Sequence, residues 1–284
     1  MKTISIITLC LISLLSTGQS HSDTQNFKVD TKTLKAFHLY NRSGNVKVKG
    51  VVGSVATIEV KRKIKSSSAK KLEEAKRELR LDSMYVDNAI YFYVRTEEHT
   101  FEIDENGYGS YSSCCWNSWD NRVAVDYDFD IILMIPKELD LRVATHHKDL
   151  EIEDFDGNLY ARNHHDNLIA RRLGGTVSLN NHHGDIKASF SKSPTEDCSY
   201  RTHHGDIVIE YPGDLSAIAL FKSHHGEFYT EFDWSPEPVI MVKSTSGNGT
   251  RYEVGGSTAV RINDGGSSHD FSTWHGDIYV NKLK

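Results

Sequence analysis

The histidines of this chain recur as adjacent pairs at nearly constant intervals. Ten of the fifteen histidines form five pairs, whose first members are His146, His164, His182, His203 and His224. The intervals between them are 18, 18, 21 and 21 residues. Near the end of the chain, "STWHGDIYV" repeats this context with Trp274 in the first position and His275 in the second. Self-similarity at such a period indicates a repeat architecture, in which one short unit stacks on the next.

Each repeat unit contains short runs in which apolar and polar residues alternate, as at Ile186 and Ala188 or at Ile207 and Ile209. Alternation is typical of β-strands, and the units are too short for helical repeats or propeller blades. The sequence therefore predicts an all-β fold, a parallel β-solenoid with coils of about 18–21 residues. Stacked coils then share one narrow core, with Ile186, Ile207, Phe228 and Ile278 in it.

The repeat also predicts how the chain is divided. An Asn-to-Gly spacing of eight residues occurs at Asn45 and Gly53 as well as at Asn167 and Gly175, so one coil is expected at residues 41–55. The chain then leaves the stack of coils, and stacking resumes over residues 141–284. A further coil is expected near Thr245, 21 residues after His224.

The intervening part of the N-terminal segment, residues 21–140, has a different pattern. It predicts a small α/β insertion with one helix at about 68–82, a hairpin turning at Asp87–Asn88, and a strand at 123–135. Between the last two lies a loop, residues 97–121. Loops of this length are either functional or disordered, and the sequence favours neither.

Residues 1–20 are typical of a secretory signal peptide, with Lys2 followed by an apolar run and then small and polar residues. The run is too short to span a bilayer. We therefore expect an exported protein, whether periplasmic, cell-surface or secreted. Removal of this segment leaves Cys114, Cys115 and Cys198, an odd number that keeps at least one thiol unpaired. The net charge of −6, without a basic stripe, argues against nucleic-acid binding.

The segments "HHGDIKA", "HHGDIVI" and "WHGDIYV", with "NRSGNVKV" upstream, resemble the adhesin-like β-strand repeat domains of bacterial envelope proteins, of the autotransporter adhesin head type. The resemblance covers roughly residues 35–284 and includes the order of segments. It implies a solenoid that acts as a non-enzymatic binding or scaffold module for a cell-surface or envelope ligand. The function of these families is largely unknown, and histidine here fills a position that they more often give to Asn, Ser, Lys or Tyr.

In a solenoid, the histidine pairs of successive coils lie above one another about 5 Å apart. Neutral imidazoles at this spacing are able to share Zn, Cu or Ni between coils, which makes all ten paired histidines candidate ligands: His146, His147, His164, His165, His182, His183, His203, His204, His224 and His225. Asp185, Asp206 and Glu227 are candidate supporting carboxylates.

The competing hypothesis is a purely structural stack of flat rings. Under either hypothesis we expect the pairs to lie at a corner with at least one row exposed. We also expect the pKa of these histidines to be lowered, because protonated neighbours would repel.

Two further hypotheses concern other residues. Asp149, Asp185, Asp206 and Asp277 form a row of the kind that polysaccharide-active solenoid enzymes carry, but Asp after Gly is common in turns, and no nucleophile or triad accompanies the row. We expect no enzyme activity. Exposed aromatic residues provide either a ligand contact surface or a cap for the open end of the solenoid: Tyr108, Tyr111, Trp116, Trp119 and Trp234.

Overall fold

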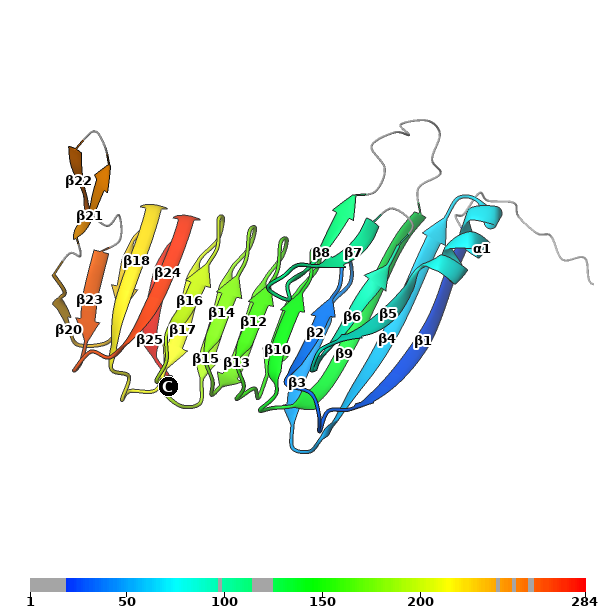
Figure 1. Cartoon of the computed structure of the whole chain (residues 1–284), viewed down its shortest axis with the longest axis horizontal. Helices are drawn as coiled ribbons and strands as arrows, with labels where there is room; N and C mark the ends of the chain where they lie inside the picture. Colours follow the sequence, from blue (N-terminus) through cyan, green and yellow to red (C-terminus); the bar gives the residue numbers. More distant parts are fainter. Residues whose placement is uncertain (1–18, 97–98, 114–124, 239–240, 247–248, 255–257) are drawn as a thin grey trace, which may run out of the picture.

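The computed structural model of this chain describes residues 19–96, 99–113, 125–238, 241–246, 249–254 and 258–284. Two large sheets stack their strands along one long axis, as Figure 1 shows. The predicted signal peptide, Cys114, Cys115, Trp116 and Trp119 lie outside the described residues, except that β1 begins at Gln19. The thiol of Cys198 is free and buried.

Sheet A has ten strands. In spatial order they are β1 (Gln19–Asp30), β4 (Val55–Ser66), β9 (Val125–Pro136), β3 (Val46–Val51), β11 (Leu150–Glu153), β13 (Leu168–Leu173), β15 (Ile186–Phe190), β17 (Ile207–Tyr211), β25 (Ile278–Lys282) and β19 (Phe228–Thr230).

Sheet B has eleven strands. In spatial order they are β20 (Trp234–Pro236), β23 (Thr258–Ile262), β18 (Ala217–His225), β24 (Ser267–His275), β16 (Cys198–Arg201), β14 (Val177–Asn180), β12 (Leu159–Arg162), β10 (Asp140–Ala144), β2 (Ala36–Tyr40), β6 (Ala89–Arg95) and β5 (Arg80–Val86).

From β10 to β19 the chain alternates between the two sheets, and equivalent strands pair in parallel. Leu150 pairs with Leu168, which pairs with Ile186, at the interval of 18 residues. Ile186 then pairs with Ile207 at the interval of 21. Because successive side chains of a strand point to opposite faces, alternate residues of both sheets fill the space between them, and these are fully buried.

The strands at both ends pair differently. β1, β4 and β9 are joined antiparallel at one end of sheet A, and β5 pairs antiparallel with β6 in sheet B. At the other end, β18, β23 and β20 are joined antiparallel. The all-β prediction with one helix is confirmed, but both sheets are mixed and neither closes, so the chain is not a purely parallel solenoid.

The first coil predicted from the sequence pairs with later coils in both sheets. β3 pairs in parallel with β11, and β2 pairs in parallel with β10, across the chain segment that separates them. The departing segment extends both sheets beyond this coil, through β9 and β4 in sheet A and through β6 and β5 in sheet B. Helix α1 (Ala69–Glu78) packs against β1 and β4 with Leu72 and Ala75 buried, and Ser68 caps its N-terminus. It ends four residues before the expected 82.

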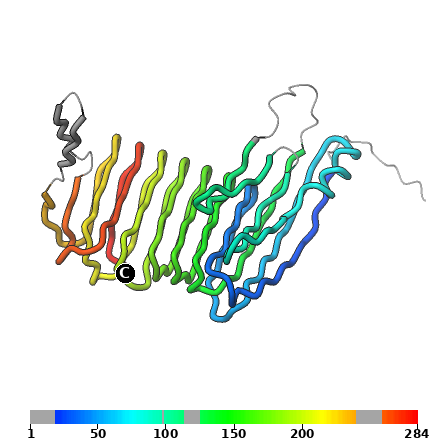
Figure 2. Tube along the Cα trace, viewed as in Figure 1, coloured from blue at the N-terminus to red at the C-terminus, as the bar shows by residue number. Residues whose placement is uncertain are grey.

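Three expectations from the sequence are wrong. The predicted loop 97–121 contains an antiparallel hairpin, β7 (His99–Ile103) and β8 (Gly109–Ser113). The expected coil near Thr245 is a separate two-stranded hairpin, β21 (Met241–Ser246) and β22 (Gly249–Val254). The order of the last coils also differs from the chain order, because β24 lies between β16 and β18, and β25 lies between β17 and β19. In Figure 2 the red C-terminal tube is correspondingly inserted between yellow segments.

Candidate metal centre

A buried polar residue immediately before each of the first four doublets, and before Trp274, fixes the corner on which the rings lie. Asn163 Nδ2 donates to the carbonyl oxygens of Lys148 and Asn167, at 3.0 and 3.2 Å. Asn181 makes the equivalent pair of bonds to Asp166 and Asp185. Thr145, Thr202 and Thr273 use their hydroxyl groups in the same way. These side chains satisfy carbonyls that the turn would otherwise leave unpaired. We did not predict this role from the sequence, although Asn or Thr precedes most of the pairs.

The residue after each of the first four doublets, and the residue after His275, has a left-handed backbone. Lys148 and Asp166 have φ of 78° and 69°, which the left-handed helical region allows. In later corners Gly205 and Gly276 reach 138° and 134°, where only glycine is free of strain. A Cβ on Gly205 would also lie 2.3 Å from the carbonyl oxygen of Gly184 in the neighbouring corner. The corners are therefore stacked backbone to backbone.

The first residues of the doublets form an inner column of stacked rings. Their centroids are 4.4 Å apart for His146 and His164, 4.7 Å for His164 and His182, and 5.0 Å for His182 and His203. Trp274 then lies between His203 and His224, at 5.8 and 3.8 Å. The second residues form an outer column at 4.8–5.2 Å, in the order His147, His165, His183, His204, His275 and His225. We call the two columns together the histidine edge.

Within the first four doublets the two rings meet edge to face. The centroids of His146 and His147 are 4.4 Å apart with an interplanar angle of 68°, and the pairs at 164, 182 and 203 are similar. The lone pair of an imidazole lies in the plane of its ring, so stacked faces offer nothing to an ion between them. An ion can be held only beside the stack, where ring edges of the two columns converge.

This convergence is tightest at the start of the histidine edge. The diagonal distance between inner and outer ring centroids is 5.2 Å for His146 and His165, but 5.9 Å for His164 and His183 and 6.4 Å for His182 and His204. One ring nitrogen from each of His146, His147 and His165 lies within 4.8 Å of the others.

Burial affects the ionisation of the histidine edge. The Nδ1 atoms of His146, His164 and His182 are buried and have no hydrogen-bond partner in the structure. Loss of water, with repulsion from neighbouring imidazoles, lowers the pKa of His146 to about 4. The pKa values of His147, His164, His182 and His204 are lowered too, with burial again the largest cause. Repulsion between rings, the cause we expected, is the smaller contribution.

The predicted supporting carboxylates are engaged elsewhere. Asp185 Oδ1 accepts a hydrogen bond from the backbone N–H of Asp206 at 3.0 Å, and Asp206 Oδ1 accepts one from the N–H of Asp277 at 2.8 Å. Glu227 accepts from the hydroxyl of Tyr229. Asp149 likewise bonds the N–H of Asn167. The bonds of the three aspartates join one corner to the next, which agrees with the turn role that we weighed against catalysis.

The predicted aromatic contact residues have different environments. Tyr108 is 40% exposed. Tyr111 instead packs against Phe101 and joins two strands, because its hydroxyl donates to the carbonyl of Tyr40 and accepts from the N–H of Val94. Trp234 is 56% exposed on β20, at the end of sheet B.

No family model matches this chain, and no curated protein sequence matches it. Three solved structures are similar to it: a putative cell adhesion protein from Clostridium sporogenes (TM-score 0.44, 8% identity, covering 93% of this chain and 100% of that one), a putative adhesin from Bacteroides fragilis (0.31, 8%, 92% and 97%) and a putative lipid binding protein from Parabacteroides distasonis (0.30, 11%, 92% and 97%). These likenesses assign neither a family nor an activity. No helix among the described residues has the length and apolar character required to cross a membrane.

Proposed function

We propose that this protein is a non-catalytic, exported scaffold that binds a late transition-metal ion, Zn, Cu or Ni, on its histidine edge. The stacked coils act as a rigid, solenoid-like support. The observation that carries the proposal is the convergence of ring nitrogens from His146, His147 and His165 within 4.8 Å. Neutral imidazole is a preferred ligand of all three metals.

The site requires only small side-chain movement to close on an ion. Two nitrogens bound to one tetrahedral zinc ion lie about 3.4 Å apart, since each bond is about 2.0–2.1 Å. Rotation of the partly exposed rings that moves each nitrogen by a fraction of an ångström to an ångström brings the three nitrogens to that separation. A fourth position stays open to water or to a ligand from solution, as in zinc sites with three protein ligands.

The lowered pKa values favour metal binding. A histidine must be neutral to ligate, so protons compete with the metal. Because the pKa of His146 is about 4, this ring stays neutral in mildly acidic surroundings. The guanidinium of Arg42 opposes binding, because it contributes to the lowered pKa of both His146 and His147 and so lies close enough to repel a cation.

A matched pair of variants tests the site. His165→Asn removes a proposed ligand at the end of the histidine edge where the two columns are closest. His204→Asn makes the same change in the outer column, at a position where the inner and outer rings are farther apart. In calorimetric titrations of the whole chain with Zn²⁺ and Ni²⁺, with Mg²⁺ as a negative control, we expect the first binding event to weaken at least tenfold in H165N. We expect it to remain in H204N.

A third variant strengthens the test. Arg42→Gln removes the opposing charge, so it should tighten binding severalfold. Failure of the unaltered protein to bind Zn²⁺ or Ni²⁺, or equal loss in both histidine variants, would exclude the proposed site. In that case the histidine edge would be a structural stack.

A further inference from the structure

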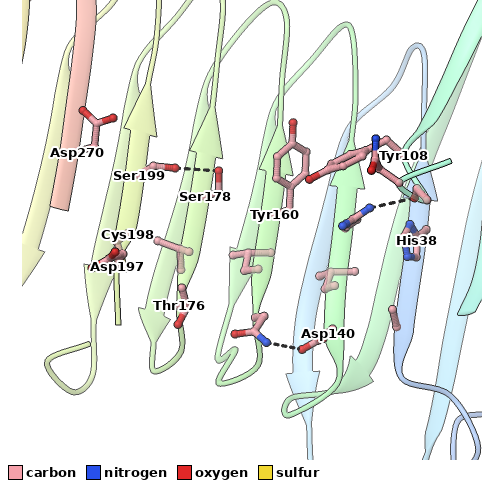
Figure 3. Close-up of a pocket in the computed structure, with 18 of the residues that line it drawn as sticks. His38, Tyr108, Asp140, Tyr160, Thr176, Ser178, Asp197, Cys198, Ser199 and Asp270 are labelled. Carbon is pink, nitrogen blue, oxygen red and sulfur yellow. Dashed lines mark hydrogen bonds between the residues drawn. The ribbon is translucent and has the colours of Figure 1, made fainter. Parts of the chain in front are cut away.

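A second feature lies on the outward face of sheet B, away from the corners that hold the histidines. An open groove of about 700 Å³ crosses the strands of this sheet (Figure 3). The turn between β7 and β8, at Gly107 and Tyr108, forms one end of it. Sequence patterns do not reveal this groove, because its residues come from strands spread over residues 36–270.

The groove is built from one register position across seven strands. Tyr91 pairs with His38, His38 with Arg142, and Arg142 with Tyr160. Tyr160 pairs with Ser178, Ser178 with Ser199, and Ser199 with Asp270. Because all of these side chains project from the same face of sheet B, they form a row with the ordinary strand spacing of about 4.8 Å. Figure 3 shows this row from His38 through Tyr160, Ser178 and Ser199 to Asp270.

Side-chain size shapes the row into a trough. Its middle consists of Ser178 and Ser199, whose hydroxyl oxygens are 2.9 Å apart. Larger side chains form one end of the trough. There the guanidinium carbon of Arg142 lies 4.0 Å from the ring centroid of Tyr108, and Arg142 donates to the carbonyl of Gly107. The ring of Tyr160 meets that of Tyr108 edge to face, at 5.7 Å.

One group in the wall of the groove is buried without being satisfied. His38 is only 3% exposed, and its Nδ1 has no hydrogen-bond partner in the structure. Burial, together with the positive charge of Arg142, lowers its pKa to about 4, so the ring is neutral. A buried polar atom without a partner is costly, and in a native structure it calls for a structural or functional explanation.

The charges in the groove indicate what kind of ligand fits. Asp140 accepts from Asn158, Asp270 pairs with Arg201, and Asp197 accepts from the N–H of Ser268. The charged groups are therefore satisfied within the protein, and the remaining exposed chemistry is hydroxyl groups and aromatic rings. The face of a sheet also has no free backbone groups for an added peptide strand. The groove is open to solvent, so it does not enclose an acyl chain.

We propose that this groove binds a neutral oligosaccharide. Sugar rings would pack against Tyr108 and Tyr160, and their hydroxyl groups would exchange hydrogen bonds with Ser178 and Ser199. From Tyr160 to Asp270 the row extends about 14 Å at the usual strand spacing, enough for a short chain of linked rings. This site is separate from the metal centre and does not depend on it.

Affinity electrophoresis of the whole chain in gels that contain laminarin, mannan, soluble starch or xylan tests the proposal. We expect at least one of these neutral polysaccharides to retard the protein. Tyr160→Ala removes a packing surface, and Ser178→Phe fills the trough from its outward face. We expect each to weaken retardation at least tenfold with unchanged far-UV circular dichroism.

Tyr229→Ala, which removes an exposed ring outside the groove, is the control and should be retarded like the unaltered protein. Retardation should also survive EDTA, which separates this site from the histidine edge. Three results would overturn the proposal: no retardation by any neutral polymer, equal retardation of Y160A and the unaltered protein, or binding confined to alginate or to phosphatidylcholine vesicles.

Discussion

The coils formed by residues 141–211 and those formed by residues 214–284 follow the same local rules but stack differently. In the first region, spatial order follows chain order at intervals of 18 or 21 residues. In the second, β24 and β25 arrive last in the chain and pair directly with β16 and β17, which displaces β18 and β19 outward. A shared repeat pattern thus specifies what kind of neighbour a strand accepts, without specifying which one.

Buried polar contacts distinguish the two regions. The hydroxyl of Tyr211 lies 2.7 Å from that of Tyr200 and 2.9 Å from Nδ1 of His269, and Nε2 of His269 lies 3.2 Å from the hydroxyl of Ser267. His269 belongs to β24, and both tyrosines belong to the last coil of the first region. This network is satisfied only when β24 lies next to β16. We infer that it selects the inserted order, because buried polar groups are costly when unpaired.

The largest expected effect is at the glycine corners. Gly205→Ala and Gly276→Ala each force a Cβ to within 2.3 Å of a neighbouring carbonyl oxygen at a φ above 130°, so each should lower the free energy of unfolding by about 3 kcal/mol or more. Gly213→Ala is the control, since a Cβ added there would have no atom within 4 Å, and should change stability by less than about 0.5 kcal/mol. Urea unfolding measures all three.

The two corner variants also compare the two regions. If the inserted coil is packed as tightly as the coil that follows chain order, G276A and G205A will have similar effects. A G276A protein nearly as stable as the unaltered chain would show that the inserted coil is loosely held.

A smaller effect is expected from pH. Burial lowers the pKa of His38 and of His269 to about 4, against an ordinary value of 6.5. The unfolded chain therefore takes up protons first, and stability falls as the pH drops from about 6.5, levelling off below about 4. For His269, which is 1% exposed, this loss is on the order of 2–3 kcal/mol.

Unfolding curves at pH 7.5, 6 and 4.5 for the unaltered chain, His269→Gln and His38→Gln measure this effect for each of the two buried rings. The stability advantage of the unaltered chain over each variant should shrink as the pH falls. An advantage that stays constant across this range would contradict the assignment of neutral, buried rings.

The smallest effect concerns the bridging hydroxyl. Tyr211→Phe leaves the hydroxyl of Tyr200 and Nδ1 of His269 without their shared partner, which should cost about 1–3 kcal/mol. Tyr229→Phe removes an exposed hydroxyl that bonds Glu227 and should cost less than about 0.5 kcal/mol. Thermal melts at pH 7.5 compare the two, and equal melting temperatures would mean that the network does not select the strand order.

The histidine pairs predicted the intervals at which coils pair, and the alternation of apolar residues predicted the all-β class. The Asn-to-Gly spacing placed the first coil at residues 41–55, far in the chain from its partner strands. These properties are local, because the spacing of apolar residues along a strand fixes which side chains face the core. The sequence likewise predicted imidazoles about 5 Å apart, since that distance is the ordinary spacing of strands.

Only the tertiary structure decided the rest. The order of the last coils depends on the contact of His269 with Tyr211, 58 residues away in the chain, and on the bond from Tyr211 to Tyr200. The position of the candidate metal centre depends on how far the inner and outer rings diverge along the histidine edge, and the groove depends on register across seven strands. Local patterns leave these properties open, because many arrangements satisfy the same alternation and only packing between distant residues distinguishes their energies.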